Sequence, residues 1–147
     1  MLHAKDGCET EAIPYADLAA DDWGLAYERV VGVVYELDGF HVEQRGLTLG
    51  LLDRGIDVFA TNDEGHQAFI QCKSGTKKLG KQGVEKVLYS GGNFIFEHRR
   101  CPRPEHVLAA PNLDAIMSKQ SRWHFLRHNP KEFGVKLVLR EIPWPRV

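Results

Sequence analysis

The stretch GIDVFATNDEGHQAFIQCKSG covers residues 55–75. It contains two runs of strand-forming residues separated by turn residues, which is typical of a β-hairpin. The segment Asn62-Asp63-Glu64-Gly65 fits a type I turn followed by a glycine in the left-handed region, the usual form of a three-residue hairpin loop. Polar residues near the open end of this hairpin are unexpected, because packing alone would favour Val or Ile there.

The loop fixes the pairing of the two strands. Counting back from it places Phe59 opposite Phe69 and Asp57 opposite Gln71, and alternation puts Lys73 on the same face. Directly opposite side chains are roughly 5 Å apart at Cβ, so Asp57, Gln71 and Lys73 are predicted to form a polar cluster beyond a buried aromatic pair. The other face is predicted to be apolar or small throughout: Ile56, Val58, Ala60, Ala68, Ile70 and Cys72.

This cluster has the composition of a metal site. A carboxylate and an amide oxygen at that separation can hold a hard divalent cation, which prefers oxygen ligands, and the backbone carbonyl of Cys72 could add a third. The Lys73 ammonium could then orient or deprotonate a metal-bound water and offset charge on a phosphate. The same residues could instead form an Asp57–Lys73 ion pair that closes the rim of the sheet.

Helices and strands are predicted on both sides of the hairpin. A capped helix to about Leu37, ended by Asp38-Gly39, leads into a strand that begins at Phe40. The later elements are a helix over residues 77–92 that ends at Gly91-Gly92, an apolar strand over 106–110, a helix over 112–128 and a strand over 135–142. The segment 93–105 is ambiguous in pattern, and we expect a loop there after a helical or extended turn. The order α-β-β-β-α-β-α-β predicts a mixed α/β fold, with a central sheet flanked by helices.

Composition sets the broad class. The length of 147 residues, with 43% hydrophobic and 27% charged residues, suits one globular domain. No apolar run approaches the length of a membrane span, and the N-terminal residues lack the apolar core of a signal peptide. Three widely spaced cysteines argue against a disulfide framework. We therefore expect an intracellular, cytoplasmic protein that makes no contact with a membrane.

The net charge of −1 hides a strong asymmetry. Residues 1–40 carry two basic and nine acidic side chains, residues 41–70 two and five, and residues 71–147 fifteen and six, so their net charges are −7, −3 and +9. A basic half of this kind is what a surface that binds a polyanion would need. A solvated surface that balances the acidic half is the alternative.

Two motifs together resemble a known family. Gly55-Ile56-Asp57, followed by a hairpin and Gln71-x-Lys73, resembles the PD-(D/E)xK nuclease superfamily. It is most similar to the Mrr-type restriction endonucleases, in which Gln replaces the acidic residue of the last motif, and archaeal Holliday-junction resolvases share this core. Upstream, Tyr27-Glu28 and then Leu37-Asp38-Gly39-Phe40 match the family's aromatic-Glu helix and Gly-aromatic strand.

The resemblance implies a restriction-endonuclease-like fold and an endonuclease that hydrolyses phosphodiester bonds of DNA with Mg²⁺ or Mn²⁺. Asp57 would be the central metal ligand, Gln71 a neutral metal or water ligand, Lys73 the catalytic lysine and Glu28 a ligand carried by the first helix. Gln71 lacks the charge of a carboxylate, so metal binding should be weaker than with Glu. One charge–charge contact near 4 Å at an effective dielectric of 20 is worth about 4 kcal/mol before desolvation.

The resemblance covers residues 20–112. We therefore expect a single nuclease-like domain over residues 1–147, with a poorly defined segment (1–20), a nuclease core (20–112) and a C-terminal helix and strand (113–147). Its predicted roles would lie in restriction, in DNA repair or recombination, or in phage biology. The basic residues expected to contact DNA are Lys77, Lys78, Lys81, Arg99, Arg100 and Arg103.

Other functions remain open at this point. The chain could be a non-cleaving module that binds DNA or a partner on the same fold, or a nuclease for RNA. A single active site cuts one strand, so cleavage of a duplex would need a homodimer, and two-fold symmetry is the commonest way to form one. A targeting partner protein could supply the specificity for which the sequence shows no base-reading motif.

Overall fold

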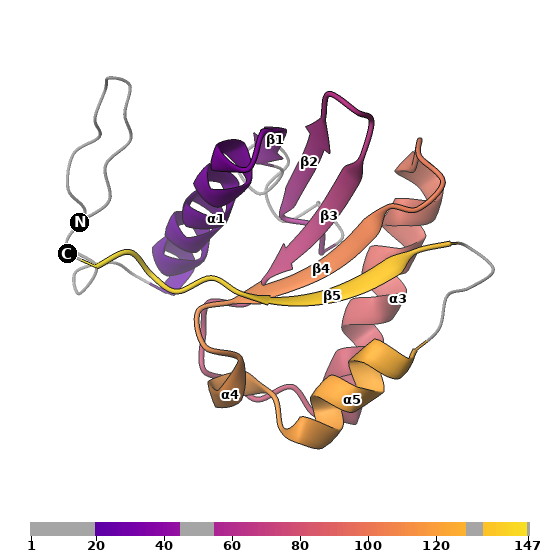
Figure 1. The fold of residues 1–147 in the computed structure, drawn as a ribbon. Coiled ribbons are helices and arrows are strands. Elements are labelled where there is room, and N and C mark those ends of the chain that lie inside the picture. The colour runs from indigo at the N-terminus through magenta and orange to yellow at the C-terminus, as the bar shows by residue number, and fades with distance from the viewer. Residues whose placement is uncertain (1–19, 45–54, 129–133, 147) are drawn as a thin grey trace.

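The computed structural model describes residues 20–44, 55–128 and 134–146 (Figure 1). The predicted order of elements is confirmed, except that the last predicted helix is two helices. The elements are α1 (Ala20–Leu37), β1 (Phe40–Gln44), β2 (Val58–Asn62), β3 (Gln67–Cys72), α3 (Lys81–His98), β4 (Glu105–Ala110), α4 (Leu113–Ile116), α5 (Lys119–Arg127) and β5 (Lys136–Glu141). No helix in this part of the chain is long and apolar enough to cross a bilayer.

The described strands form one sheet in the order β1-β2-β3-β4-β5. The first three strands pair antiparallel, whereas β3, β4 and β5 pair parallel, so the predicted mixed sheet is confirmed. Parallel neighbours need a crossover connection, and α3 and α5 supply the two crossovers. Helix α1 covers one face of the sheet, and α3 and α5 cover the other (Figure 1).

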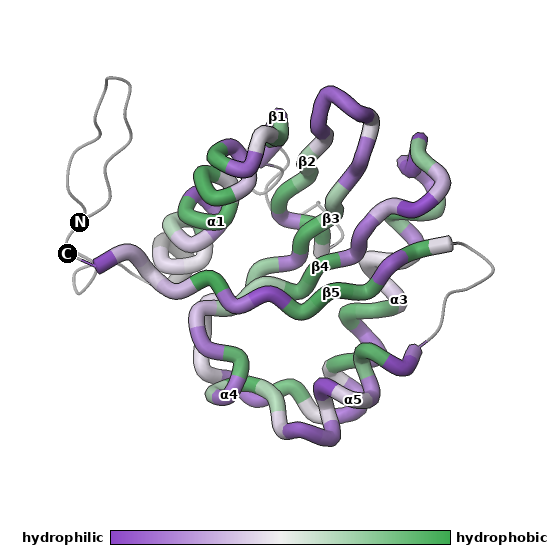
Figure 2. The backbone as a smooth tube through the Cα atoms, viewed as in Figure 1, coloured by the Kyte–Doolittle hydropathy of each residue, from purple (hydrophilic) through white to green (hydrophobic). Residues whose placement is uncertain are grey.

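Each face of the sheet has its own hydrophobic core. Under α1, the buried side chains of Tyr27 and Val31 pack with Val58 and Ile70 of the hairpin. Under α3 and α5, Leu88 and Phe125 belong to a second cluster that includes Leu108 of β4. Figure 2 shows the tip of the hairpin between β2 and β3 as hydrophilic, in contrast to the hydrophobic strands at the centre of the sheet. Because each face of the sheet is covered by helices, strand β3 is buried on both faces, and only Cys72 at its end is partly exposed.

The hairpin pairs as predicted near its loop. Phe59 is the partner of Phe69, and their rings stack with centroids 4.8 Å apart. Gly65 has φ +86°, the left-handed conformation that the loop requires. The side-chain oxygen of Asn62 accepts hydrogen bonds from the backbone of Glu64 and His66 and so holds the loop closed.

The prediction that Gly91-Gly92 ends the second helix is wrong, because α3 continues to His98. Gly91 allows close approach to the sheet: a Cβ there would overlap the His106 ring and lie 2.8 Å from Oε1 of Gln71. The segment 93–105, where a loop after a helical or extended turn was expected, consequently begins as the last part of α3. The predicted helix over 112–128 is interrupted because Ser118 caps α5, its hydroxyl accepting from the Ser121 N–H at 3.0 Å.

Gly91 and Gly92 provide a matched pair of stability tests. At Gly92 nothing lies within 4 Å of an added Cβ, so Gly92→Ala should stabilise α3 by about 0.5–1 kcal/mol. Gly91→Ala gains the same helix propensity, but its added methyl group must displace His106 or Gln71. We therefore expect the free energy of unfolding to fall by about 1–3 kcal/mol. Urea unfolding of both variants measures the difference. Equal stability of the two variants would show that α3 does not approach the sheet closely at Gly91.

Candidate active site

The carboxyl ends of the parallel strands meet at one edge of the sheet. There the Lys73 N–H donates to the Ala109 carbonyl and the Ile142 N–H donates to the Ala110 carbonyl, both at 2.9 Å. In open α/β sheets, ligands bind outside the carboxyl ends of the strands. This edge is therefore where the fold favours a site.

Helix α1 is tied to the same edge. The hydroxyl of buried Tyr27 donates to the Ile142 carbonyl at 2.7 Å, and the Tyr27 ring packs on Trp144. Burial raises the pKa of Tyr27, with smaller contributions from Cys72 and Glu141, so the phenol stays a donor at neutral pH. Glu28 follows directly in sequence, and its Oε1 is buried. Tyr27 thus ties helix α1, which carries Glu28, to the chain just beyond the carboxyl end of β5.

Asp57 lies at a β-bulge just before β2. Its N–H donates to the Ile70 carbonyl at 2.9 Å, although Ile70 is the pairing partner of Val58. Two residues therefore face one, which is the arrangement of a bulge. Ile56 consequently packs with Phe69 on the α3 side, whereas Val58 packs under α1. The prediction that Ile56 and Val58 share a face is wrong, because the bulge interrupts the alternation.

The bulge also changes the surroundings of the Asp57 carboxylate. Its Oδ2 accepts a hydrogen bond of 2.7 Å from the Cys72 N–H at the end of β3. Gly55, not Asp57, lies beside the Gln71 amide: a Cβ on Gly55 would be 2.7 Å from Nε2 of Gln71. With φ +91°, Gly55 also adopts a conformation that favours glycine. The prediction that Asp57 lies opposite Gln71 is therefore wrong, and the two side chains have different hydrogen-bond partners at the same end of β3.

Gln71 forms a buried hydrogen bond that the sequence analysis missed. Its Oε1 lies 2.6 Å from Nε2 of His106, and the two residues are only 3% and 1% exposed. The oxygen that was expected to bind a metal or a water therefore already has a partner within the protein. The only signal in the sequence was a single histidine at the start of an otherwise apolar strand.

His106 is neutral at physiological pH. Burial is the main cause that lowers its pKa from 6.5 to about 4, and the nearby His128 adds a smaller effect. A neutral imidazole has one donor and one acceptor nitrogen. Because the amide oxygen can only accept, Nε2 must carry the proton and donate to Gln71.

A lysine-rich cleft of about 900 Å³ opens beside Gln71, between the carboxyl end of β3 and the start of α3. Gly55, Gln71 and Ser90 form part of its lining, and among the described residues that line it none is acidic. The lysines that line it are Lys73, Lys77, Lys78, Lys81 and Lys86. The structure thus brings Gln71 and Lys73 together with the three lysines that were expected to contact DNA.

The arginines expected to contact DNA lie at the other end of α3. The helix has 18 residues, so its two ends are about 27 Å apart at 1.5 Å per residue. Arg99 donates to the Pro102 carbonyl at 2.6 Å, and the Arg100 backbone donates to the Gln67 side chain, also at 2.6 Å. Arg103 lines a separate pocket with Phe40. The predicted DNA contacts therefore fall into two separate groups.

The residues at the carboxyl edge suit a hard cation. In the described part of the chain no three His, Cys, Asp or Glu side chains gather as a metal-binding group. Mg²⁺, however, usually keeps several waters and needs only one or two carboxylates. Asp57, which is partly buried and oriented by the Cys72 N–H, could supply one. Glu28 and the Cys72 carbonyl are the other oxygen donors expected here.

Comparison with known proteins bears on the family and on the fold. Residues 23–91 match the model of the Mrr catalytic-domain family, described as restriction endonuclease. The resemblance to the Mrr-type restriction endonucleases is confirmed. The matched segment contains all four expected catalytic residues: Glu28, Asp57, Gln71 and Lys73.

A solved structure confirms the restriction-endonuclease-like fold. The crystal structure of a repair endonuclease from Pyrococcus abyssi superposes with a TM-score of 0.54 at 15% sequence identity. The alignment covers 88% of this chain but 50% of the Pyrococcus protein, so the chain spans half of that protein's length. Among curated proteins, none matches this chain.

The buried His106 should make the stability of the protein depend on pH. The unfolded state takes up a proton near pH 6.5, whereas the folded state resists protonation down to about pH 4. The free energy of unfolding should therefore fall by about 3 kcal/mol between pH 6.5 and pH 4. Urea unfolding over this range measures the slope. His106→Leu should reduce the slope of the free energy of unfolding against pH. An equal slope in that variant would show that other groups cause the loss of stability at low pH.

Proposed function

We propose that this chain is a metal-dependent DNA endonuclease that hydrolyses phosphodiester bonds at the carboxyl edge of its sheet, with Mg²⁺ or Mn²⁺. One observation carries the proposal: Lys73 enters a cleft lined by four further lysines, directly beyond the strand end to which the Asp57 carboxylate is hydrogen-bonded. A phosphodiester backbone held in that cleft would lie beside Lys73 and next to the strand end that holds the Asp57 carboxylate.

The charge at the start of α3 supports an anionic ligand. Helix N-termini carry a partial positive charge and favour acidic residues, each by about 0.3–1 kcal/mol. The first turn of α3 contains no acidic residue, and Lys77, Lys78 and Lys81 lie around it. Such an arrangement is unfavourable for the isolated helix but favourable for binding phosphate groups.

The expected site residues have separate proposed roles. Asp57, Glu28 and the Cys72 carbonyl would hold the metal ion, which when bound would activate water and offset charge on the phosphate. The hydrogen bond from the Cys72 N–H fixes the Asp57 carboxylate before any ligand arrives, which avoids a reorganisation cost. The backbone of Lys73 is fixed by Ala109, so its ammonium can stabilise charge on a phosphate oxygen or transfer a proton.

A second candidate is a DNA-binding module that does not cut. The hydrogen bond between Gln71 and His106 favours it, because it leaves Asp57 and Glu28 as the only side-chain metal ligands among the expected site residues. Cleavage of both strands by the first candidate would also require a second copy or a partner chain.

Substitutions of Asp57 and of Lys73 should impair metal binding and cleavage differently. Asp57→Asn keeps an acceptor for the Cys72 N–H but removes the charge, so Mn²⁺ affinity should fall at least about tenfold and cleavage should be lost. Lys73→Ala should bind Mn²⁺ within about twofold of wild type but cut about 10²–10⁴-fold more slowly, because only the chemical step uses the ammonium. Calorimetric metal titration and cleavage of a labelled duplex measure the two effects.

The control is Lys136→Ala, an exposed lysine at the amino end of β5, which should behave as wild type. Normal cleavage by Asp57→Asn would exclude the proposed site. Duplex binding by wild type without cleavage in either Mg²⁺ or Mn²⁺ would establish the second candidate instead.

The two basic groups should contribute unequally to DNA binding. Each phosphate contact adds about 0.9 to the slope of log affinity against log salt. Replacing Lys77, Lys78 and Lys81 with Ala should therefore lower the slope by up to about 3, measured in EDTA. The same change at Arg99, Arg100 and Arg103 should lower it less, because Arg99 already donates to backbone carbonyls. A larger loss from the arginines would place the main DNA contact at the other end of α3.

A further inference from the structure

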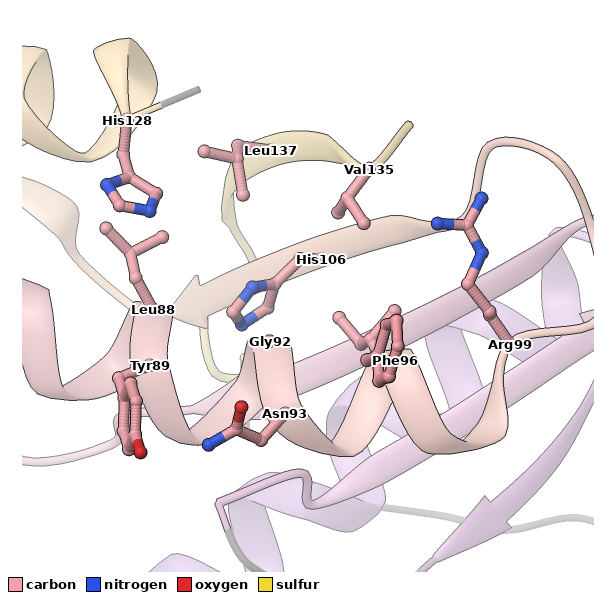
Figure 3. Close-up of a pocket in the computed structure, with 11 residues that line it drawn as sticks. Leu88, Tyr89, Gly92, Asn93, Phe96, Arg99, His106, His128, Val135 and Leu137 are labelled. Carbon is pink, nitrogen blue, oxygen red and sulfur yellow. The ribbon is translucent and has the colours of Figure 1, made fainter. Parts of the chain in front are cut away.

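The buried hydrogen bond between His106 and Gln71 connects two cavities on opposite sides of α3. His106 lines an apolar pocket of about 430 Å³, where Figure 3 shows its ring beside Gly92. Gln71 lines the lysine-rich cleft. The hydrogen bond passes beneath Gly91, whose missing side chain leaves room for both partners.

The direction of this bond decides which end of the Gln71 amide reaches the cleft. Oε1 accepts from Nε2 of His106 and is turned inward. Nε2 of Gln71 is turned toward Gly55, which lines the cleft together with Ser90. An amide nitrogen donates hydrogen bonds and does not bind a metal cation. Phosphate oxygens are acceptors that such a donor can contact.

We propose that His106 is a positioning residue that holds the Gln71 oxygen inward, so that Gln71 presents N–H donors to a phosphate in the cleft and is not a metal ligand. The identity of the acceptor rests on the proposed function, whereas the orientation of the amide does not. The proposal also gives a physical reason for a glutamine at this position. A glutamate there would bury a charge beside a neutral imidazole, which costs more than burying an amide.

The orientation can be tested by NMR without any assay of activity. In ¹⁵N-labelled full-length protein, His106 should be the neutral form with the proton on Nε2, and that N–H should exchange slowly with solvent. In Gln71→Ala the Nε2–H signal should shift and exchange faster. Finding the proton on Nδ1 would overturn the proposal, because Nε2 would then accept from the Gln71 amide and the oxygen would face the cleft.

The role of Gln71 can be tested by separating metal binding from DNA binding. Gln71→Ala should bind Mn²⁺ within about twofold of wild type, in contrast to Asp57→Asn. In EDTA its affinity for duplex DNA should fall about tenfold, the size expected for one hydrogen bond to a charged group. A loss of Mn²⁺ affinity as large as that of Asp57→Asn would overturn the proposal.

Gly91→Ala and Gly92→Ala test the positioning itself. An added methyl at Gly91 separates His106 from Gln71 without changing either polar residue, so DNA affinity in EDTA should fall as in Gln71→Ala. Gly92→Ala should have no such effect, and equal DNA affinity of the two variants would contradict the positioning role. If Gly91→Ala does not fold, His106→Gln, which keeps a donor, and His106→Leu, which has none, replace this comparison.

Failure of this inference can be distinguished from failure of the proposed function. If wild type binds neither DNA nor metal, the proposed function fails, and the His106 tautomer still decides the amide orientation. If wild type cuts DNA but His106 carries its proton on Nδ1, the function stands and this inference is wrong.

Discussion

Strand β3 is buried on both faces, so every polar group that it carries must find a partner inside the protein. Two buried glutamines show the consequence. Gln67, at one end, accepts from the backbone of Arg100 and Cys101 and so fixes the loop after α3. Gln71, at the other end, is bound to His106 of the neighbouring strand. These long-range bonds tie α3 and β4 to the central strand, and the elements around the site depend on them.

The carboxyl end of β3 is where the buried central strand reaches the candidate active site. Within three residues the strand passes from buried Gln71 through half-buried Cys72 to exposed Lys73. The bulge before β2 brings a carboxylate to the Cys72 N–H at that same point. Parallel pairing of β3 with β4, and of β4 with β5, then adds the edge to which Tyr27 attaches α1. A site at this edge is therefore assembled from α1, β2, β3, β4 and β5, which are held together by hydrogen bonds that the backbone forms with itself and with the side chains of Tyr27 and Asp57.

The asymmetry of charge has a structural counterpart. The five lysines of the cleft lie in the short stretch between the end of β3 and the first turns of α3, where the helix itself is positive. Like charges so close together repel one another, and an anion in the cleft would relieve that repulsion. The arginines beyond the other end of α3 are partly engaged with backbone carbonyls, which leaves the lysines as the stronger electrostatic feature.

The sequence by itself determined what depends on local pattern. The loop at Gly65 and the pairing of Phe59 with Phe69 follow from turn chemistry and alternation, and the short motifs around Asp57 and Lys73 were enough to predict the resemblance to Mrr-type restriction endonucleases. Only the tertiary structure decided what depends on contacts between distant segments. The bulge at Asp57 appears only in the hydrogen bonds to β3, and the partner of Gln71 lies 35 residues away in a strand whose composition looked apolar. Gly91 resembled a helix end because no local signal separates a glycine that ends a helix from one that lets the helix approach a sheet.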